Sequence, residues 1–596
     1  MQHPHAVRPS PASLPSETMH NIHKSSLAAL ILAPIAAAQT ARDEARLDDV
    51  SVSNTADGFD ISLQADGNTR VAMWVDERDP DNTFDDAIWC AISTDRGVTY
   101  GPEISVYDQS FAAIDIDDAR LAVSNGVIYI TFDDDRNGSS APTTVLMRSD
   151  DMGTTWTETV LGNNFNNAEI FVDGDNVLIL SYDNSSSTNI LNGQWSTDQG
   201  LTFAAHAPIS AGDVDIDGWT GMVDGDTAYA LWFDDGTNPG DNDLLFSSSV
   251  AGGAWSAPVR VDQDGTGLGD VDVYPKLAMG NGRLYAAFVE DGRNGGSTSQ
   301  DEVYFCVSND GGASWAETAI SPVGQDADYM NLAANGDTVA ITWADDSNAA
   351  FDSANVVVSN DGGATFGAQY TVPGAGGAGL DDHQHTAIFI EGGRIVLAFE
   401  SDAYTASTLD EWPAYCFSVD NGATWNGPFV MGNNFAADED IDTEGTAWSY
   451  ADGSLCGLWQ TDGDYSAIRS AVFAGGIRFP FIGATDNLNG TVTFSMGGAD
   501  TTAGNSFARW AASDVLGMVA HPENPAEMLE LDSSFVLNYV LARPRTFAAP
   551  IGADGTAMLT AGYGSLAGTF YIQGWVNVGP SITGGTTTSD VIEITL

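Results

Sequence analysis

The chain has 596 residues, and its 83 acidic and 20 basic side chains give a formal net charge of −63 at pH 7. This acid excess excludes sequence-independent binding to nucleic acid or to an anionic membrane surface, because both depend on Lys and Arg side chains that neutralise phosphates. Hydrophobic residues make up 43% of the chain and aromatic residues 10%, which is enough for a folded core. The length allows about four ordinary domains, or one large repetitive domain with an appendage.

The N-terminal region has the composition of a secretory signal peptide. Lys24 lies in a basic start, and the apolar run Leu27 to Ala38 ends in three alanines that form a small-residue cleavage site. Residues 1–18 precede a second methionine, Met19, and are interpreted as an additional leader. The apolar run is too short to span a bilayer. The sequence therefore predicts a signal peptide within residues 1–38 and a secreted, extracellular chain without membrane insertion.

Each of the four cysteines lies inside an apolar, strand-like run. Four cysteines are too few for a disulfide scaffold in a chain of this length. Because free cysteine is among the most buried residue types, we expect small buried hydrophobic residues rather than disulfides at Cys90, Cys306, Cys416 and Cys456.

A short motif recurs along the chain and predicts a repetitive fold. The pattern Ser-x-Asp-x-Gly-x-Thr/Ser-aromatic, called the box below, occurs in six intact copies that end in Tyr100, Trp156, Phe203, Trp315, Phe366 and Trp425. A seventh copy, Ser248 to Trp255, has Val250 in place of the Asp. The Asp can accept backbone hydrogen bonds and the Gly can supply a positive φ, so we expect a turn whose Asp is structural rather than catalytic.

Eight apolar strands that end in acidic clusters accompany the boxes, among them VAMWVDE, IYITFDDD and CGLWQTD. Each unit is interpreted as strand A, a tight turn, strand B, an acidic loop, strand C, the box and strand D. The sequence thus predicts an all-β chain in which residues 48–480 form an eight-bladed β-propeller, with seven blades as the alternative if the boxless last unit packs elsewhere.

The boxes resemble the BNR or Asp-box repeats of the sialidase (neuraminidase) superfamily, and the resemblance covers residues 48–480. It implies a propeller fold and, if the chain is an enzyme, a glycoside hydrolase. Sialidases have six blades and an early Arg-Ile-Pro segment, and this chain contains no such segment. No catalytic residue is therefore transferred from the family.

The boxes stop after Gly475, and residues 482–596 read as a separate unit. Alternating segments at 491–494, 534–539 and 569–576 predict the strands of a small β-sandwich. This unit resembles the C-terminal β-domains of large secreted bacterial proteins.

The loops before the innermost strands are acidic. We expect a ring of carboxylates at one mouth of the central channel, formed by Asp57, Asp115, Asp215, Asp326, Asp382 and Asp442. Like charges at such a site raise each other's pKa unless a cation or an arginine intervenes. The alternative is a uniformly acidic surface, as in a salt-adapted secreted protein.

One acidic loop has the spacing of a calcium-binding loop. Asp213, Asp215 and Asp217 precede Gly218, and Asp224 stands at the twelfth position. This pattern predicts Ca²⁺ as a cofactor, although period-2 aspartates also fit one polar face of a strand.

Basic and histidine residues in equivalent loops are candidates for substrate binding. Arg78, Arg136 and Arg293 can grip a sugar acid, or they can neutralise acidic neighbours in their own loops. Asp382, His383 and His385 form a further candidate group, in which the two histidines of one strand would share a face. Exposed aromatic rings can stack on sugars, and the candidates near these loops are Trp219, Tyr274, Tyr329 and Trp412.

These features favour a secreted, sialidase-like propeller that recognises, and if catalytic hydrolyses, extracellular glycan. The alternative is a non-catalytic, calcium-stabilised binding or scaffold protein. We expect weak or no sialidase activity, because each of the three arginines has an acidic neighbour that competes with a sialate carboxylate.

Overall fold

The computed structural model describes most of the propeller and separate strands of the C-terminal part. The described ranges are 45–48, 59–77, 86–108, 115–138, 142–183, 185, 189–210, 216–234, 242–263, 275–291, 301–347, 352–374, 383–391, 393–402, 411–431, 441–461 and 471–478, followed by strands within 481–595. The described residues contain strands and turns but no helix, so none of them forms a helix long and apolar enough to cross a bilayer.

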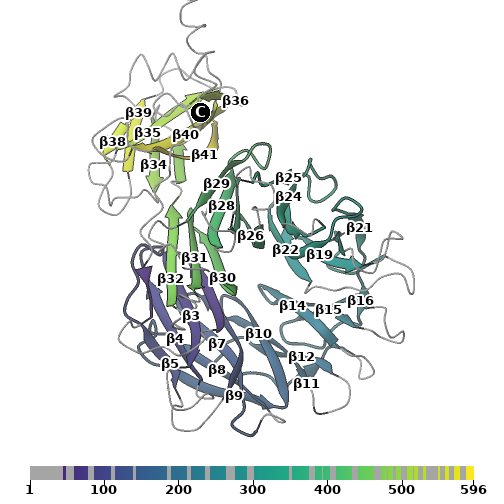
Figure 1. Ribbon diagram of the computed structural model, residues 1–596. Helices are drawn as coiled ribbons and strands as arrows, with labels where there is room; N and C mark the ends of the chain where they lie inside the picture. The colour runs from purple at the N-terminus through teal and green to yellow at the C-terminus, as the bar shows by residue number, and fades with distance from the viewer. Residues whose placement is uncertain are drawn as a thin grey trace, which may run out of the picture.

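Eight four-stranded antiparallel sheets are arranged as the blades of a propeller (Figure 1). Blades 1 to 4 consist of β2 (Phe59–Asp66), β3 (Thr69–Glu77), β4 (Asp86–Ser93) and β5 (Ile104–Asp108); β6 (Ile116–Ser124), β7 (Val127–Asp134), β8 (Thr143–Ser149) and β9 (Thr157–Asn163); β10 (Phe165–Asp173), β11 (Asn176–Asp183), β12 (Ile190–Ser196) and β13 (Ala207–Pro208); and β14 (Ile216–Asp224), β15 (Thr227–Asp234), β16 (Asp243–Val250) and β17 (Val259–Arg260).

Blades 5 to 8 have the same order. They consist of β18 (Lys276–Gly280), β19 (Arg283–Asp291), β20 (Asp301–Ser308) and β21 (Ala316–Ala319); β22 (Ala327–Asn335), β23 (Thr338–Asp345), β24 (Ser353–Ser359) and β25 (Tyr370–Thr371); β26 (His383–Glu391), β27 (Arg394–Ser401), β28 (Trp412–Ser418) and β29 (Asn426–Val430); and β30 (Ile441–Ala451), β31 (Ser454–Thr461), β32 (Ala471–Arg478) and β1 (Ala45–Arg46). The prediction of an all-β, eight-bladed propeller is confirmed.

The ring is closed by the N-terminal strand. β1 pairs with β32 of the last blade, with Ala45 opposite Ala474, and the Leu47 N–H donates to the carbonyl oxygen of Val472 at 2.8 Å. Leu47 is 7% exposed in the core between blades 8 and 1. This closure explains why the last unit has no box, because its outermost strand does not follow strand C along the chain.

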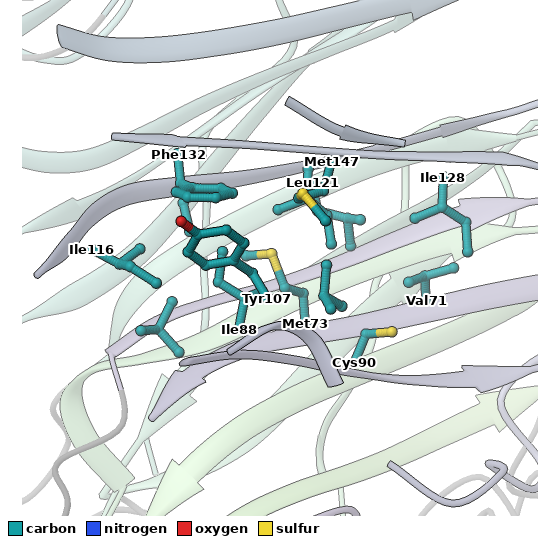
Figure 2. Packing of buried hydrophobic residues seen from close by; sticks show 14 of the residues in the cluster. Val71, Met73, Ile88, Cys90, Tyr107, Ile116, Leu121, Ile128, Phe132 and Met147 are labelled. Carbon is teal, nitrogen blue, oxygen red and sulfur yellow. The ribbon is translucent and has the colours of Figure 1, made fainter. Parts of the chain in front are cut away.

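Hydrophobic cores fill the spaces between adjacent blades. In the core between blades 1 and 2, Met73 and Ile88 face Leu121, Phe132 and their neighbours (Figure 2). Strand B carries a fully buried aromatic residue in seven of the eight blades, namely Trp74, Phe132, Trp232, Phe288, Trp343, Phe399 and Trp459, whereas Tyr182 in strand B of blade 3 is half-buried. All four cysteines are buried and free, as predicted.

All six intact boxes form the same hydrogen-bonded turn. In the first, Ser93 Oγ accepts from the Gly97 N–H at 2.8 Å, and Asp95 accepts from the Thr99 N–H at 2.9 Å and the Thr99 hydroxyl at 2.8 Å. Arg96 and Gly97 both have positive φ, at 65° and 76°. The Asp therefore stabilises the turn, and the box aromatic packs on the core shared with the preceding blade, as Trp156 does.

The box predicts acid-dependent stability, and Asp198 is the test position. Hydrogen bonds from the Thr202 side chain and backbone lower the pKa of Asp198 to about 2, below the roughly 3.9 of an unfolded chain. A lowered carboxyl pKa contributes stability above about pH 4 that is lost as the pH falls through 2. Asp198→Asn should therefore lower the melting temperature at pH 6 and have little effect at pH 2. The control is Asp226→Asn, at an exposed turn residue outside the box; an equal effect of both variants would contradict the prediction.

Nine further strands lie in the C-terminal part. They form the sheets β33-β34-β39, β38-β35-β40-β41 and β36-β37, from β33 (Phe481–Asp486), β34 (Thr491–Gly497), β35 (Phe507–Ser513), β36 (Leu516–Ala520), β37 (Met528–Leu531), β38 (Ala548–Pro550), β39 (Ala557–Gly562), β40 (Thr569–Asn577) and β41 (Thr586–Thr595). β34 and β40 cover two of the predicted segments, and 534–539 lies outside the described residues. The β-sandwich stays a prediction.

Candidate functional site

The innermost strands of the propeller share an irregularity near their first residues. In seven of the eight blades a register shift interrupts the pairing of strand A with strand B. A residue with positive φ stands at five of these bulges, namely Asp60, Asp118, Asn167, Tyr329 and His385. We call the set of bulges and the ends of strands A around them the channel mouth, because strands A of neighbouring blades contact one another around the centre of the ring (Figure 1).

The bulges connect neighbouring blades by hydrogen bonds. Asp60 Oδ2 of blade 1 accepts from the Ala119 N–H of blade 2 at 2.9 Å. The Thr386 hydroxyl of blade 7 donates to the carbonyl oxygen of Tyr329 in blade 6 at 2.7 Å. A bulge removes backbone groups from the ladder, and here a neighbouring blade satisfies them. At these places the polar groups on the rim of the channel mouth are held in fixed positions.

One side of the rim is acidic. Burial raises the pKa of Asp117 and Asp118, and neighbouring aspartates add to the shift of Asp117. Burial also raises the pKa of Glu169, which Arg120 and Lys276 partly oppose. These residues come from strands A of blades 2, 3 and 5. Carboxyl groups of blades 2 and 3 therefore lie within electrostatic reach of two cations, Arg120 and Lys276.

Two members of the predicted carboxylate ring, Asp115 and Asp326, have side chains in the part of the chain that the structure describes. The N–H of Asp115 donates to Asp135 Oδ1 at 3.1 Å, and the N–H of Asp326 donates to Asp345 Oδ1 at 3.2 Å. The two aspartates therefore occupy equivalent places in blades 2 and 6. Asp57, Asp215 and Asp382 lie outside the described residues, and of Asp442 only the backbone in β30 is described.

The opposite side of the rim is built from Tyr329, His385 and Glu400. The ring of Tyr329 lies 4.1 Å from that of His385, centroid to centroid. His385 Nδ1 is 2.8 Å from Glu400 Oε2, and the Thr446 hydroxyl of blade 8 donates to Glu400 Oε1. The Glu400 side chain is 0% exposed, whereas that of His385 is 22% exposed. Because a carboxylate only accepts, Nδ1 carries the proton and Nε2 is the basic nitrogen.

His383 does not share a face with His385. His383 is 1% exposed and its ring meets Phe399 edge to face, whereas His385 contacts Glu400, the next residue of β27. Consecutive strand residues point to opposite faces. The bulge between Gln384 and Ala387 therefore breaks the alternation that predicted a shared face.

Of the three candidate arginines, the structure describes Arg136. Its guanidinium contacts Asp134 Oδ2 at 2.5 Å and Glu158 Oε1 at 2.7 Å, and it donates to the Tyr107 hydroxyl at 2.7 Å. The Arg136 guanidinium is thus paired with nearby acidic side chains, as the alternative interpretation predicted. Arg78 and Arg293 lie outside the described residues.

The structure contradicts one of the four predicted calcium ligands, Asp224. Residues 216–224 form the extended strand β14, which pairs along its length with β15. Asp217 and Asp224 are seven residues apart on this strand, so about 23 Å separates them at ~3.3 Å per residue. They cannot share one cation. Asp213 and Asp215 lie outside the described residues, among which no group of three His, Cys, Asp or Glu side chains could hold a metal ion.

The candidate aromatic residues differ in exposure. Trp219 is 3% exposed and belongs to the core between blades 3 and 4, so its proposed role in sugar stacking is wrong. Tyr274 lies outside the described residues, and Trp412 is half-buried. Tyr329 is 40% exposed.

Sequence reasoning missed Glu400, Thr446 and the bulges. Glu400 was one of many acidic residues after strand B, and no local pattern set it apart. The common feature that could have pointed to the bulges is their position opposite the strand B aromatic, as for Asp60 and Asp118 opposite Trp74 and Phe132.

No family model matches the chain, and no curated protein matches its sequence. In structure the chain is similar to a PL25 ulvan lyase bound to GlcA(1-4)Rha3S, with 13% identity over 60% of this chain and 92% of that one and a TM-score of 0.38. It is also similar to an α-L-arabinanase from Penicillium chrysogenum, with 12% identity over 60% and 94% of the two chains and a TM-score of 0.34.

A third similar structure is an α-L-arabinofuranosidase from Fusarium graminearum, with 11% identity over 74% of this chain and 98% of that one and a TM-score of 0.33. The structural neighbours of this eight-bladed propeller thus include glycoside hydrolases and lyases. At these values no substrate or activity transfers to this chain.

Proposed function

We propose that this chain is an extracellular glycan-binding propeller that takes a neutral or cation-bridged glycan at the channel mouth. The observation that carries the proposal is Tyr329. Among the described residues, Tyr329 is the aromatic member of the exposed large hydrophobic side chains. The bulge at which Tyr329 has a positive φ holds its ring beside His385 on the rim. A fixed, half-exposed ring next to hydrogen-bonding groups suits the apolar face and the hydroxyls of a sugar.

The charge of the rim favours neutral over acidic glycans. An acidic sugar would have to displace Asp134 and Glu158 from Arg136, or to approach a rim rich in carboxylates. A neutral glycan carries no charge that the carboxylates of the rim would repel. A cation bound at the rim would remove this repulsion for an acidic glycan. Extracellular location rests on the signal-peptide pattern in residues 1–38.

Binding is tested by calorimetry with a panel of neutral polysaccharides, namely glucan, mannan, galactan and arabinan, with a sialoside as the acidic comparison. Tyr329→Ala should weaken binding of the glycan that binds best by about fivefold, because the ring supplies on the order of 1 kcal/mol of stacking. Leu201→Ala, at a 62% exposed apolar residue of a box, is the matched control and should leave binding unchanged. Equal binding by both variants would remove Tyr329 from the site.

Calcium is a second proposal, now resting on Asp213, Asp215 and Asp217, and it belongs to the alternative of a calcium-stabilised binding or scaffold protein. A ligand that binds the native state stabilises it by about 2.7 kcal/mol at a hundredfold excess over Kd. Excess chelator should therefore lower the melting temperature, and Asp217→Asn should reduce that shift. A melting curve that chelator leaves unchanged would end this proposal.

A further inference from the structure

The pair of His385 and Glu400 has a geometry that binding alone does not require. Glu400 is fully buried, and both carboxylate oxygens are engaged, by His385 and Thr446. A buried carboxylate that accepts from Nδ1 fixes the tautomer and orientation of the ring and stabilises the imidazolium formed when Nε2 takes a proton. His385 is therefore built as a base whose proton-accepting atom belongs to a partly exposed ring.

A carboxyl pair that can supply a proton lies nearby. Asp326 directly precedes β22 and Asp346 directly follows β23. Asp346 Oδ1 is buried and accepts no hydrogen bond from any residue that the structure describes, and the Asp326 carboxyl lies beside Asp346. One proton shared between the two carboxyls satisfies both. Burial and the neighbouring Asp326 raise the pKa of Asp346 to about 6, so this proton is retained into the weakly acidic range.

Tyr329 lies between the two groups along the chain. It stands three residues after Asp326 and its ring contacts that of His385. The charge of Asp328 acts on both Asp346 and Tyr329, so the carboxyl pair and the Tyr329 ring lie in one electrostatic neighbourhood. An acid and a base on either side of a bound sugar are the arrangement that an inverting hydrolysis uses. Burial and, after it, the charge of Asp328 raise the pKa of Tyr329, so the tyrosine stays neutral under a bound sugar.

We infer that the channel mouth hydrolyses a glycosidic bond of the bound neutral glycan, with His385 as the base that activates water and the Asp326–Asp346 pair as the acid; this inference rests on the proposed function. Water gives a proton to His385 Nε2 while its oxygen bonds to the anomeric carbon. The bond from that carbon to the glycosidic oxygen breaks, and the oxygen takes the proton of the carboxyl pair. The proton on His385 returns to the pair through solvent, so one water is consumed and no other reactant is needed.

The test uses the mature chain and the neutral polysaccharide that binds best in the panel. New reducing ends should be released, and the first product should have inverted anomeric configuration, because water attacks opposite the leaving oxygen. His385→Ala should lower kcat at least about 100-fold, by far more than it weakens binding, and added imidazole should restore part of the rate. Asp346→Asn should lose a similar factor without rescue by imidazole.

Glu400→Gln separates positioning from chemistry. Its amide can donate to Nδ1 and so favours the tautomer that carries the proton on Nε2, and we expect a loss in kcat of about tenfold or more with KM little changed. Melting curves of each variant exclude unfolding as the cause. Wild-type binding without turnover, retention of configuration, or loss without imidazole rescue would overturn this inference and leave the proposed function intact. Absence of binding to every glycan would overturn the proposed function itself.

Discussion

Deletion of the chain up to and including Asp48 should lower the melting temperature by roughly 10 °C. The deletion removes the pairing of β1 with β32, the buried Leu47 side chain, and the bond from the Val472 N–H to Asp48 Oδ1 at 3.2 Å. Loss of a buried Leu costs about 2–5 kcal/mol, and loss of each hydrogen bond costs about 1 kcal/mol. Their sum is comparable to the lower end of the free energy of unfolding of ordinary domains, about 5 kcal/mol. Each kcal/mol moves the melting temperature of a large domain by about 2–4 °C.

Calorimetric melting of the deletion variant and the intact chain checks this expectation. Leu47→Ala should give about half of the shift, because it leaves the backbone pairing in place. Leu201→Ala, on the exposed surface, serves as the matched control. A deletion variant that melts within a degree or two of the intact chain would show that the ring does not depend on β1.

Asp133 should make the protein less stable as the pH rises from 4 to 8. Its side chain is 3% exposed and accepts from the Thr144 hydroxyl at 2.7 Å and the Asn167 N–H at 2.5 Å. Burial raises the pKa of Asp133 to about 7 although these hydrogen bonds oppose the shift. A carboxyl whose pKa is higher folded than unfolded contributes stability below about pH 4 that is lost as the pH rises through 7. About three pKa units correspond to at most about 4 kcal/mol.

Denaturant midpoints at pH 4, 6 and 8 measure this effect. The midpoint of the wild type should fall between pH 4 and 8 by more than that of Asp133→Asn, whose side chain does not ionise. Asp226→Asn, at an exposed position, should follow the wild type. Identical pH profiles for wild type and Asp133→Asn would contradict the assignment. Together with Asp198 in the boxes, which loses its contribution in strong acid, Asp133 places the maximum of stability in weak acid.

The blades could be predicted because their information is local. Each strand B is a buried apolar run with an aromatic residue, and each box carries its own hydrogen-bonding partners within eight residues. The last blade lacks a box because β1, from the start of the propeller sequence, supplies its outer strand. The strand that closes the ring has only two residues, Ala45–Arg46, and no local pattern distinguishes so short a strand.

The site could not be predicted in the same way, because its contacts join distant segments. Tyr329 and His385 are 56 residues apart, and their ring contact depends on bulges in two adjacent strands. The bulge also moved His385 off the face of His383. In the calcium motif, Asp217 and Asp224 were interpreted as parts of one loop. The extended strand from Ile216 to Asp224 instead places the twelfth position at the other end of the blade.

The closing strand also has a consequence for the order of folding. Ala45 pairs with Ala474, so the two partners are separated by nearly the entire propeller sequence. During synthesis the first strand waits until the last blade exists, and bringing such distant segments together is entropically unfavourable and slow. Until then the outer edge of β32 presents unpaired backbone groups that another copy of the chain can bind. Refolding yield should therefore fall with protein concentration, because closure within one molecule competes with strand exchange between two.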